Sequence, residues 1–130
     1  MKKIAIIGAG ISGLFIANLF KKNSNYQITV FEKNHAIDLD EGYGIQLSVN
    51  SVKLLNQIGF DKFKDDKKFN PDKINFYSFK SSNKICDLDI SDFNSEDCKY
   101  TTLKRSDLVN FLKTGLENLI KTNHSISKID

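Results

Sequence analysis

The 130-residue sequence has little of what would indicate a metal site or a membrane segment. It contains two cysteines, Cys86 and Cys98, and two histidines. The cysteines lie far from either histidine, so the pattern argues against a metal centre and favours ordinary reduced thiols. No apolar run is long enough to span a bilayer. The basic start, MKK, leads into glycines instead of a signal-peptide cleavage site. We therefore expect a cytoplasmic protein.

The sequence also lacks a strong charge of one sign. Its 19 basic and 16 acidic residues give a formal net charge of +3 and are spread along the whole chain. Without a basic cluster, the balance gives no indication of a nucleic-acid partner. A hydrophobic fraction of 40% is typical of globular proteins. The length suits one modest domain but is small for an enzyme that needs both a cofactor site and a substrate site.

A glycine motif stands near the N-terminus. Residues 8–13 read GAGISG, which has the spacing G-x-G-x-x-G. The motif follows KIAII (3–7), a β-branched run suited to a short strand buried on both faces of a parallel sheet. After it, apolar residues recur at helical spacing to about Lys22, and QITVFEK (27–33) has the pattern of a second strand. The segment is thus predicted to be a βαβ unit.

In this context each glycine has a physical role in binding a dinucleotide. Gly8 permits the tight turn out of the strand, and Gly10 lets the backbone approach a pyrophosphate. Gly13 lets the helix pack close to the strand. The amides of Ile11 and Ser12 lie in the first helical turn, where unpaired N–H groups bind phosphate oxygens.

An acid completes the fingerprint. Glu32 lies at the end of the second predicted strand, about twenty residues after the last glycine. Its carboxylate can accept hydrogen bonds from both hydroxyls of an adenosine ribose, and its charge would repel a 2′-phosphate. The residues alone therefore predict FAD or NAD(H), and not NADPH, while a glycine-rich turn that binds nothing is the structural alternative.

The next segments are predicted to insert into this unit. A helix begins near Ser48 or Asn50 and ends at Gly59. Residues 74–80 and 84–90 read as a β-hairpin, and residues 99–104 as a further strand. A simple NAD-binding domain would have another parallel strand in place of this inserted segment. The apolar face of the helix is assigned to Val52, Leu54, Leu55 and Ile58.

The C-terminal part is predicted to return to the parallel sheet. A helix capped by Ser106 is expected, followed by SISKID (125–130) as the third parallel strand. His35 and His124 are interpreted as solvated loop residues. The predicted apolar face of the helix consists of Leu108, Leu112, Leu116, Leu119 and Ile120.

Together these segments predict an α/β fold. It consists of a Rossmann-like βαβ dinucleotide-binding unit with an inserted antiparallel β-hairpin and strand. We expect one incomplete FAD-binding domain over residues 1–130. Its parts are the fingerprint and the second glycine segment (1–60), the β insertion (70–104), and the helix with the third parallel strand (105–130).

Three motifs in order carry a family resemblance: GAGISG with Glu32, then GYGIQLSVNSVKLLNQIGF (42–60), then LKRSDLVNFL (103–112). Over most of its length the chain resembles the N-terminal part of the FAD-dependent aromatic-ring monooxygenases, which include salicylate and p-hydroxybenzoate hydroxylases. The resemblance implies FAD as cofactor and, for a complete enzyme, NAD(P)H, O₂ and an aromatic or quinone-type substrate.

The resemblance also implies residue roles. Gly8, Gly10 and Gly13 would hold the FAD diphosphate and Glu32 the adenosine ribose. Lys33 stands where many relatives carry an arginine, which keeps the charge but not the bidentate fork. Arg105, from the R-x-D-L motif, would contact the flavin cofactor. Four residues of the second motif would lie near the isoalloxazine and ribityl groups: Gly42, Gly44, Ile45 and Gln46.

The resemblance implies further motifs that the chain lacks. Family members are longer and carry Asp-Gly and Gly-Asp motifs linked to NAD(P)H use and to the ribityl chain, and neither dipeptide occurs here. No catalytic residue can be assigned, and the chain alone is expected to be incomplete as an enzyme, truncated before the C-terminal part of the family fold. The alternatives are a non-catalytic nucleotide-binding or interaction module and a fragment of an NAD-dependent dehydrogenase.

Overall fold

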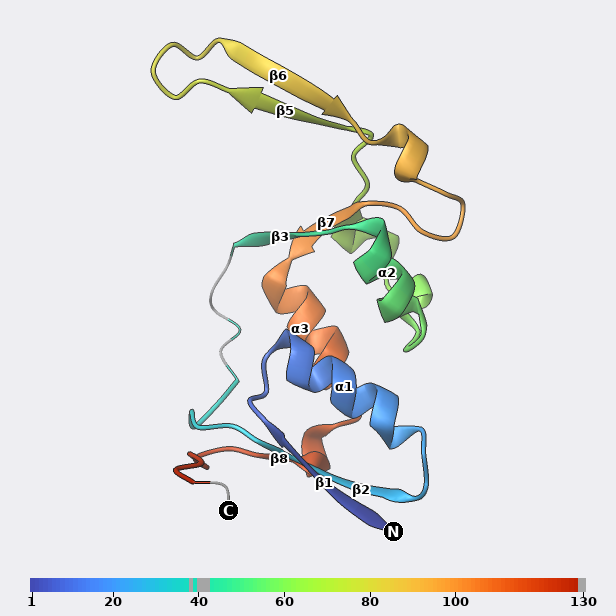
Figure 1. The fold of residues 1–130 in the computed structure, drawn as a ribbon, viewed down its shortest axis with the longest axis vertical. Helices are drawn as coiled ribbons and strands as arrows, with labels where there is room; N and C mark the ends of the chain where they lie inside the picture. The colour runs from blue at the N-terminus through green and yellow to red at the C-terminus, as the bar shows by residue number, and fades with distance from the viewer. Residues whose placement is uncertain (38, 40–42, 129–130) are drawn as a thin grey trace. The chain divides into compact units, whose positions relative to one another are not determined.

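The computed structural model describes residues 1–37, 39 and 43–128, which fall into two compact units (Figure 1). The first unit combines Met1–Tyr43 with Lys104–Asp130, and the second comprises Gly44–Leu103. The first unit therefore joins the fingerprint to the C-terminal part of the chain. None of the helices among the described residues is long and apolar enough to cross a bilayer.

The first unit is built on a parallel sheet in the order β1-β2-β8. β1 pairs with β2 from Lys2↔Tyr26 to Ile7↔Phe31. β2 in turn pairs with β8 at Val30↔Ile120 and Phe31↔Lys121. The helix α1 connects the first two strands, so the predicted βαβ unit and the α/β class are confirmed. The elements of this unit are β1 (Lys2–Ile7), α1 (Ile11–Lys21), β2 (Tyr26–Phe31), α3 (Arg105–Lys113), the 3₁₀ helix η4 (Glu117–Leu119) and β8 (Ile120–Lys121).

The core of this unit lies between α1, α3 and one face of the sheet. α1 contacts β2 and α3, and α3 lies beside α1 in Figure 1. The Asn18 side chain ties the two helices together, because its Nδ2 donates to the Leu14 carbonyl (2.9 Å) and to the Leu112 carbonyl (2.7 Å). The buried apolar residues of the unit are Ala9, Leu14, Ala17, Ile28, Val30, Leu108, Val109, Leu112 and Leu116.

The prediction that the first strand is buried on both faces is wrong. Alternate residues of β1 are exposed, namely Lys3, Ala5 and Ile7, and Ile7 is 57% exposed. On β2 the inward positions Ile28 and Val30 are buried, Thr29 between them is half-buried, and Gln27 is exposed. Among the described residues the helix α1 covers one face only, and the apolar run 3–7 cannot by itself show whether a second layer is present.

The end of the chain also differs from the prediction. The helix α3 starts at Arg105 with Lys104 as N-cap, so Ser106 lies inside the first turn. It ends at Lys113 because Gly115 takes φ +77°, a left-handed turn that a helix does not continue through. Leu119 then lies in η4 and Ile120 in β8. The third parallel strand is therefore Ile120–Lys121, and residues 125–128 of SISKID form neither helix nor strand.

The second unit holds a sheet in the order β3-β7-β4 and the predicted hairpin of β5 and β6. In the sheet, β4 runs antiparallel to β7. The hairpin strands pair antiparallel, from Lys73↔Asp89 to Tyr77↔Lys84, which confirms the predicted hairpin. A bulge between Phe76 and Tyr77 was not predicted. Its elements are β3 (Gly44–Leu47), α2 (Val49–Asn56), β4 (Lys68–Phe69), β5 (Lys73–Tyr77), β6 (Lys84–Asp89), β7 (Thr101–Lys104, its last residue in the first unit) and three 3₁₀ helices (Phe60–Lys62, Asp65–Lys67, Ser91–Phe93).

The helix α2 differs from its prediction in two ways: it ends at Asn56, so Ile58 lies beyond it and not on its apolar face, and Leu54 is exposed. Ser48 is its N-cap, without a side-chain capping bond, and Gly59 takes φ +94° beyond its end. Val52 and Leu55 are buried, but Leu54 is 50% exposed. The helix has only eight residues, so the stripe of buried positions is narrow and Leu54 falls beside it.

Candidate dinucleotide-binding site

The glycine loop between β1 and α1 is shaped by two of its three glycines. Gly8 takes φ +95°, which only glycine adopts readily, and its amide donates to the Phe31 carbonyl at 2.7 Å. A Cβ on Gly13 would lie 2.0 Å from the carbonyl oxygen of Gly8. Glycine is therefore required at Gly8 by the turn, and at Gly13 by the close packing of the helix against the strand. These are the two roles that the sequence predicts.

Gly10 is different, because nothing in the protein itself requires glycine there. Its φ is −77°, it is exposed, and a Cβ would meet nothing within 4 Å. The loop therefore leaves open space beside its backbone at the residue predicted to approach a pyrophosphate. The next residues, Ile11 and Ser12, begin α1, where amides lack an intrahelical partner, and the first turn contains no acid. These features favour an anionic ligand.

Glu32 is fixed beside this loop by two backbone amides. Its Oε2 accepts from the Ala9 amide at 2.8 Å, and its Oε1 accepts from the Asn34 amide at 3.0 Å. The hydrogen bonds from Asn34 and Ala9, with a smaller contribution from the Lys33 charge, lower the pKa of the Glu32 carboxyl, while partial burial opposes them. The side chain is thus ionised at neutral pH.

The two bonds leave Glu32 able to accept more hydrogen bonds. Each carboxylate oxygen has two lone pairs, and each uses one on a backbone amide. A ribose with two neighbouring hydroxyls can donate to the remaining positions without breaking either anchor. The carboxylate is held in one orientation before a ligand binds, so little entropy is lost when it does.

Arg105 lies in the same unit, at the first position of α3. Its amide donates to the Tyr43 carbonyl at 3.1 Å, and its guanidinium carbon lies 5.7 Å from the centre of the Tyr43 ring. The guanidinium therefore has a defined neighbour in the chain. Lys33, the other predicted cation, is exposed directly after Glu32.

The structure does not bring all of the predicted residues together in one unit. Gly8 and Gly10 lie in the loop, Ile11, Ser12 and Gly13 form the first turn of α1, and Glu32 is bonded to the loop through Ala9. The second glycine segment belongs to the other unit, as the strand β3. Within that unit Gln46 Oε1 accepts from the Tyr100 hydroxyl at 2.9 Å. Gly42 lies outside the described residues.

Two positions beside Glu32 carry no signal in the sequence. The Asn34 amide holds the carboxylate, and the His124 amide donates to the Glu32 carbonyl at 2.9 Å. The turn at Asn34 is not signalled by any motif. The position of His124 depends on β8. This strand has only two residues, too few to give a recognisable sequence pattern. His35 is exposed, as expected for a loop residue.

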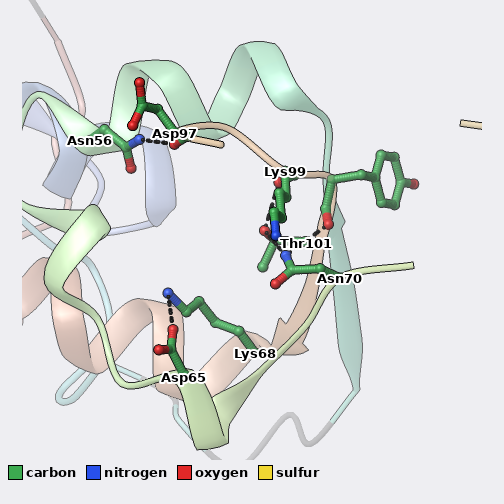
Figure 2. Close-up of polar contacts among 8 residues, drawn as sticks. Asn56, Asp65, Lys68, Asn70, Asp97, Lys99 and Thr101 are labelled. Carbon is green, nitrogen blue, oxygen red and sulfur yellow. Dashed lines mark hydrogen bonds and ion pairs between the residues drawn. The ribbon is translucent and has the colours of Figure 1, made fainter. Parts of the chain in front are cut away.

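The second unit contains a separate polar cavity of about 540 Å³ (Figure 2). Lys68 faces Asp65 across 3.0 Å, and Asn70 Nδ2 donates to the Tyr100 carbonyl and to Thr101 Oγ1, both at 2.9 Å. Asn56 Nδ2 donates to the Asp97 carbonyl at 3.0 Å. The cavity contains none of the predicted cofactor residues. The described part of the chain also holds no cluster of histidine, cysteine or acidic side chains that could bind a metal ion.

The family comparison matches the fingerprint segment. A model of the NAD(P)-binding Rossmann-like domain matches residues 6–37, which include the glycine loop and Glu32. No curated protein matches the chain by sequence.

Solved structures match nearly the whole chain. 2-Methyl-3-hydroxypyridine-5-carboxylic acid oxygenase has a TM-score of 0.74 and 19% identity, over 95% of this chain and 32% of its own. HpxO from Klebsiella pneumoniae, solved with FAD and uric acid, has a TM-score of 0.70 and 20% identity, over 93% and 30%. 2,6-Dihydroxypyridine-3-hydroxylase from Arthrobacter nicotinovorans has a TM-score of 0.66 and 18% identity, over 93% and 28%.

The chain spans about a third of the length of these enzymes. At such low identity the likeness is one of fold, and it agrees with the resemblance that the three sequence motifs predict. The chain has a Rossmann-like fingerprint segment and the fold of FAD-containing aromatic-ring monooxygenases over about a third of their length.

Proposed function

We propose that this chain binds FAD through the glycine loop and Glu32, as part of a flavoprotein monooxygenase. The observation that carries the proposal is the anchored carboxylate: Glu32 is held by Ala9 of the loop and by Asn34, with acceptor positions left for a ribose. The open space at Gly10 lies next to it in the same loop. Fold neighbours such as HpxO, which was solved with FAD, support this choice of dinucleotide.

The residues present fit part of FAD. The first turn of α1 offers amides for the diphosphate, and Glu32 offers acceptors for the adenosine ribose. Arg105 is proposed to contact the flavin cofactor, in line with the R-x-D-L motif of the resemblance. Gly44, Ile45 and Gln46 are proposed to lie near the isoalloxazine and ribityl groups.

The proposed activity of the whole protein is hydroxylation of an aromatic or quinone-type ring with NAD(P)H and O₂. FAD, when bound, would supply the redox chemistry for such a reaction. The residues of this chain would hold the dinucleotide in place. No side chain here is assigned to the chemical step, and the reductant and substrate are proposed to bind only when the remainder of such an enzyme is present.

A second candidate is NAD binding, because the matching family model describes an NAD(P)-binding domain over residues 6–37. NAD and FAD both contain the adenosine diphosphate group that this loop is proposed to bind. A non-catalytic nucleotide-binding module is another possibility, because the chain spans only about a third of the length of a similar oxygenase. These candidates differ in which ligand binds and whether turnover follows.

The test is a comparison of dissociation constants for FAD, NAD⁺ and NADP⁺ by isothermal titration calorimetry on the full chain. FAD is expected to bind tightest and NADP⁺ not to bind, since the ionised Glu32 repels a 2′-phosphate. Tighter binding of NAD⁺ than of FAD would support the dehydrogenase alternative instead. FAD-dependent oxidation of NAD(P)H by the purified chain would rule out a non-catalytic module.

A further inference from the structure

The segment after β8 runs alongside the residues that hold the proposed ribose site. The Glu32 amide donates to the Lys121 carbonyl at 2.8 Å, and the His124 amide donates to the Glu32 carbonyl at 2.9 Å. Asn123, with φ +57°, donates its amide to the Asn34 carbonyl at 3.0 Å. These three bonds place His124 directly beside Glu32, although the two residues are far apart in the sequence.

The imidazole of His124 is exposed and held in place. Its Nδ1 lies 2.6 Å from the Thr122 carbonyl oxygen, and its ring centre lies 5.8 Å from that of Phe31, with the planes tilted by 47°. A carbonyl oxygen can only accept, so Nδ1 carries the hydrogen of this bond. In the neutral ring Nε2 is then a hydrogen-bond acceptor.

The topology indicates where the base of a dinucleotide extends. In a doubly wound sheet a ligand lies across the carboxyl ends of the strands. The diphosphate belongs to the loop after β1 and the ribose to Glu32 after β2. β8 is the next strand along this edge, so a base that continues across the edge would reach the residues that follow Lys121.

We propose that His124 forms part of the base subsite and that its Nε2 accepts a hydrogen bond from the exocyclic amino group of adenine. The proposal rests on the proposed FAD site and adds to it a residue that recognises the base. Glu32 would bind the ribose and His124 would bind the purine. The hydrogen bond between Asn123 and Asn34 holds the segment after β8 against the segment after β2. A base that lacks the amino donor would then bind more weakly.

The experiment compares FAD with its hypoxanthine analogue, in which a carbonyl replaces the adenine amino group. Both ligands carry the same flavin, so both are titrated into the full chain and followed by the same flavin signal. The variants are His124→Ala and, as a matched control, Gln27→Ala, an exposed residue near the opposite end of β2. Circular dichroism checks that each variant is folded.

The wild type and Gln27→Ala are expected to prefer FAD over the analogue by about fivefold, the effect of one hydrogen bond. His124→Ala is expected to bind both ligands equally. A folded His124→Ala variant that keeps the preference, or a wild type that binds both ligands equally, would overturn the role of His124 while leaving the FAD site intact. A wild type that binds neither ligand would overturn the proposed function itself, and the His124 subsite with it.

Discussion

The Glu32 carboxylate accepts a hydrogen bond from the Ala9 amide at 2.8 Å, which joins the end of β2 to the glycine loop. Ala9 is buried and lies between Gly8 and Gly10. One side chain therefore orients the loop predicted to bind a diphosphate and also carries the acceptors predicted to bind a ribose. The two parts of the fingerprint are a single hydrogen-bonded assembly in this chain.

Replacing Glu32 by glutamine is expected to destabilise the fold as well as weaken binding. The amide nitrogen of the new side chain would face one of two N–H donors, Ala9 or Asn34, and lose that bond. The expected cost is about 1 kcal/mol near neutral pH. Urea denaturation of the wild type and Glu32→Gln measures it, with Glu96→Gln, an exposed acid of the second unit, as control.

The same pair predicts a pH dependence. The pKa of Glu32 is lowered in the folded state from its ordinary value of 4.5, so the ionised carboxylate stabilises the fold above that pH. This contribution is lost as the pH falls through the lowered folded pKa. The stability difference between wild type and Glu32→Gln should therefore be constant near neutrality and shrink below about pH 4.5. A difference that grows on acidification would contradict the assignment.

Gly13 and Gly10 should respond in opposite ways to alanine. Gly13→Ala puts a methyl group 2.0 Å from the Gly8 carbonyl oxygen and should cost at least about 2 kcal/mol of stability. Gly10→Ala meets nothing within 4 Å and should leave the stability unchanged or raise it by up to about 1 kcal/mol. Its added methyl enters the open space of the loop, so FAD affinity should fall. Thermal unfolding and FAD titration of both variants check this, and equal stabilities would refute it.

The Asn18 side chain is expected to be important for the packing of α1 on α3. Asn18→Ala removes donors to the Leu14 and Leu112 carbonyls and should cost about 1 to 2 kcal/mol. Chemical denaturation measures the loss. Asn110→Ala, an exposed asparagine on α3, is the control. A loss no larger than that of the control would mean that the bridge contributes nothing.

Arg105 provides a test of the flavin contact. Its contact with the exposed Tyr43 ring is worth only about 0.5 to 1 kcal/mol, so Arg105→Ala should stay folded. If the guanidinium contacts the cofactor, the variant should bind FAD at least about tenfold more weakly. Arg105→Lys should recover part of the affinity, since it keeps the charge without the planar fork. Lys104→Ala, an exposed neighbour, should bind like the wild type. An unchanged FAD affinity in Arg105→Ala would remove Arg105 from the proposed site.

The βαβ unit was predictable because every local signal agrees there. The run 3–7 lies in a strand, Gly8 takes the positive φ of the turn, Gly13 packs against that turn, and Glu32 follows the second strand. The hairpin 74–90 was predictable for the same reason, since two alternating strands flank a short polar turn. Where propensity, pattern and turn chemistry coincide, the sequence is sufficient.

The C-terminal segment shows where such prediction fails. Leu116, Leu119 and Ile120 keep a helical spacing, but Gly115 ends the helix and the chain turns into η4 and β8. A two-residue strand pairs only where β2 leaves an open edge, which is tertiary information. For the same reason the position of His124 beside Glu32 could not be predicted, because it depends on that strand pairing.

If the glycine loop and Glu32 form an FAD site, the purified protein should retain flavin. The purified chain is incubated with FAD, desalted and examined for visible absorbance, alongside Glu32→Ala and Gly10→Val. The wild type is expected to keep a flavin spectrum that both variants lose, while circular dichroism shows all three proteins folded. A folded wild-type protein that emerges colourless, or variants that keep the flavin, would contradict such a site.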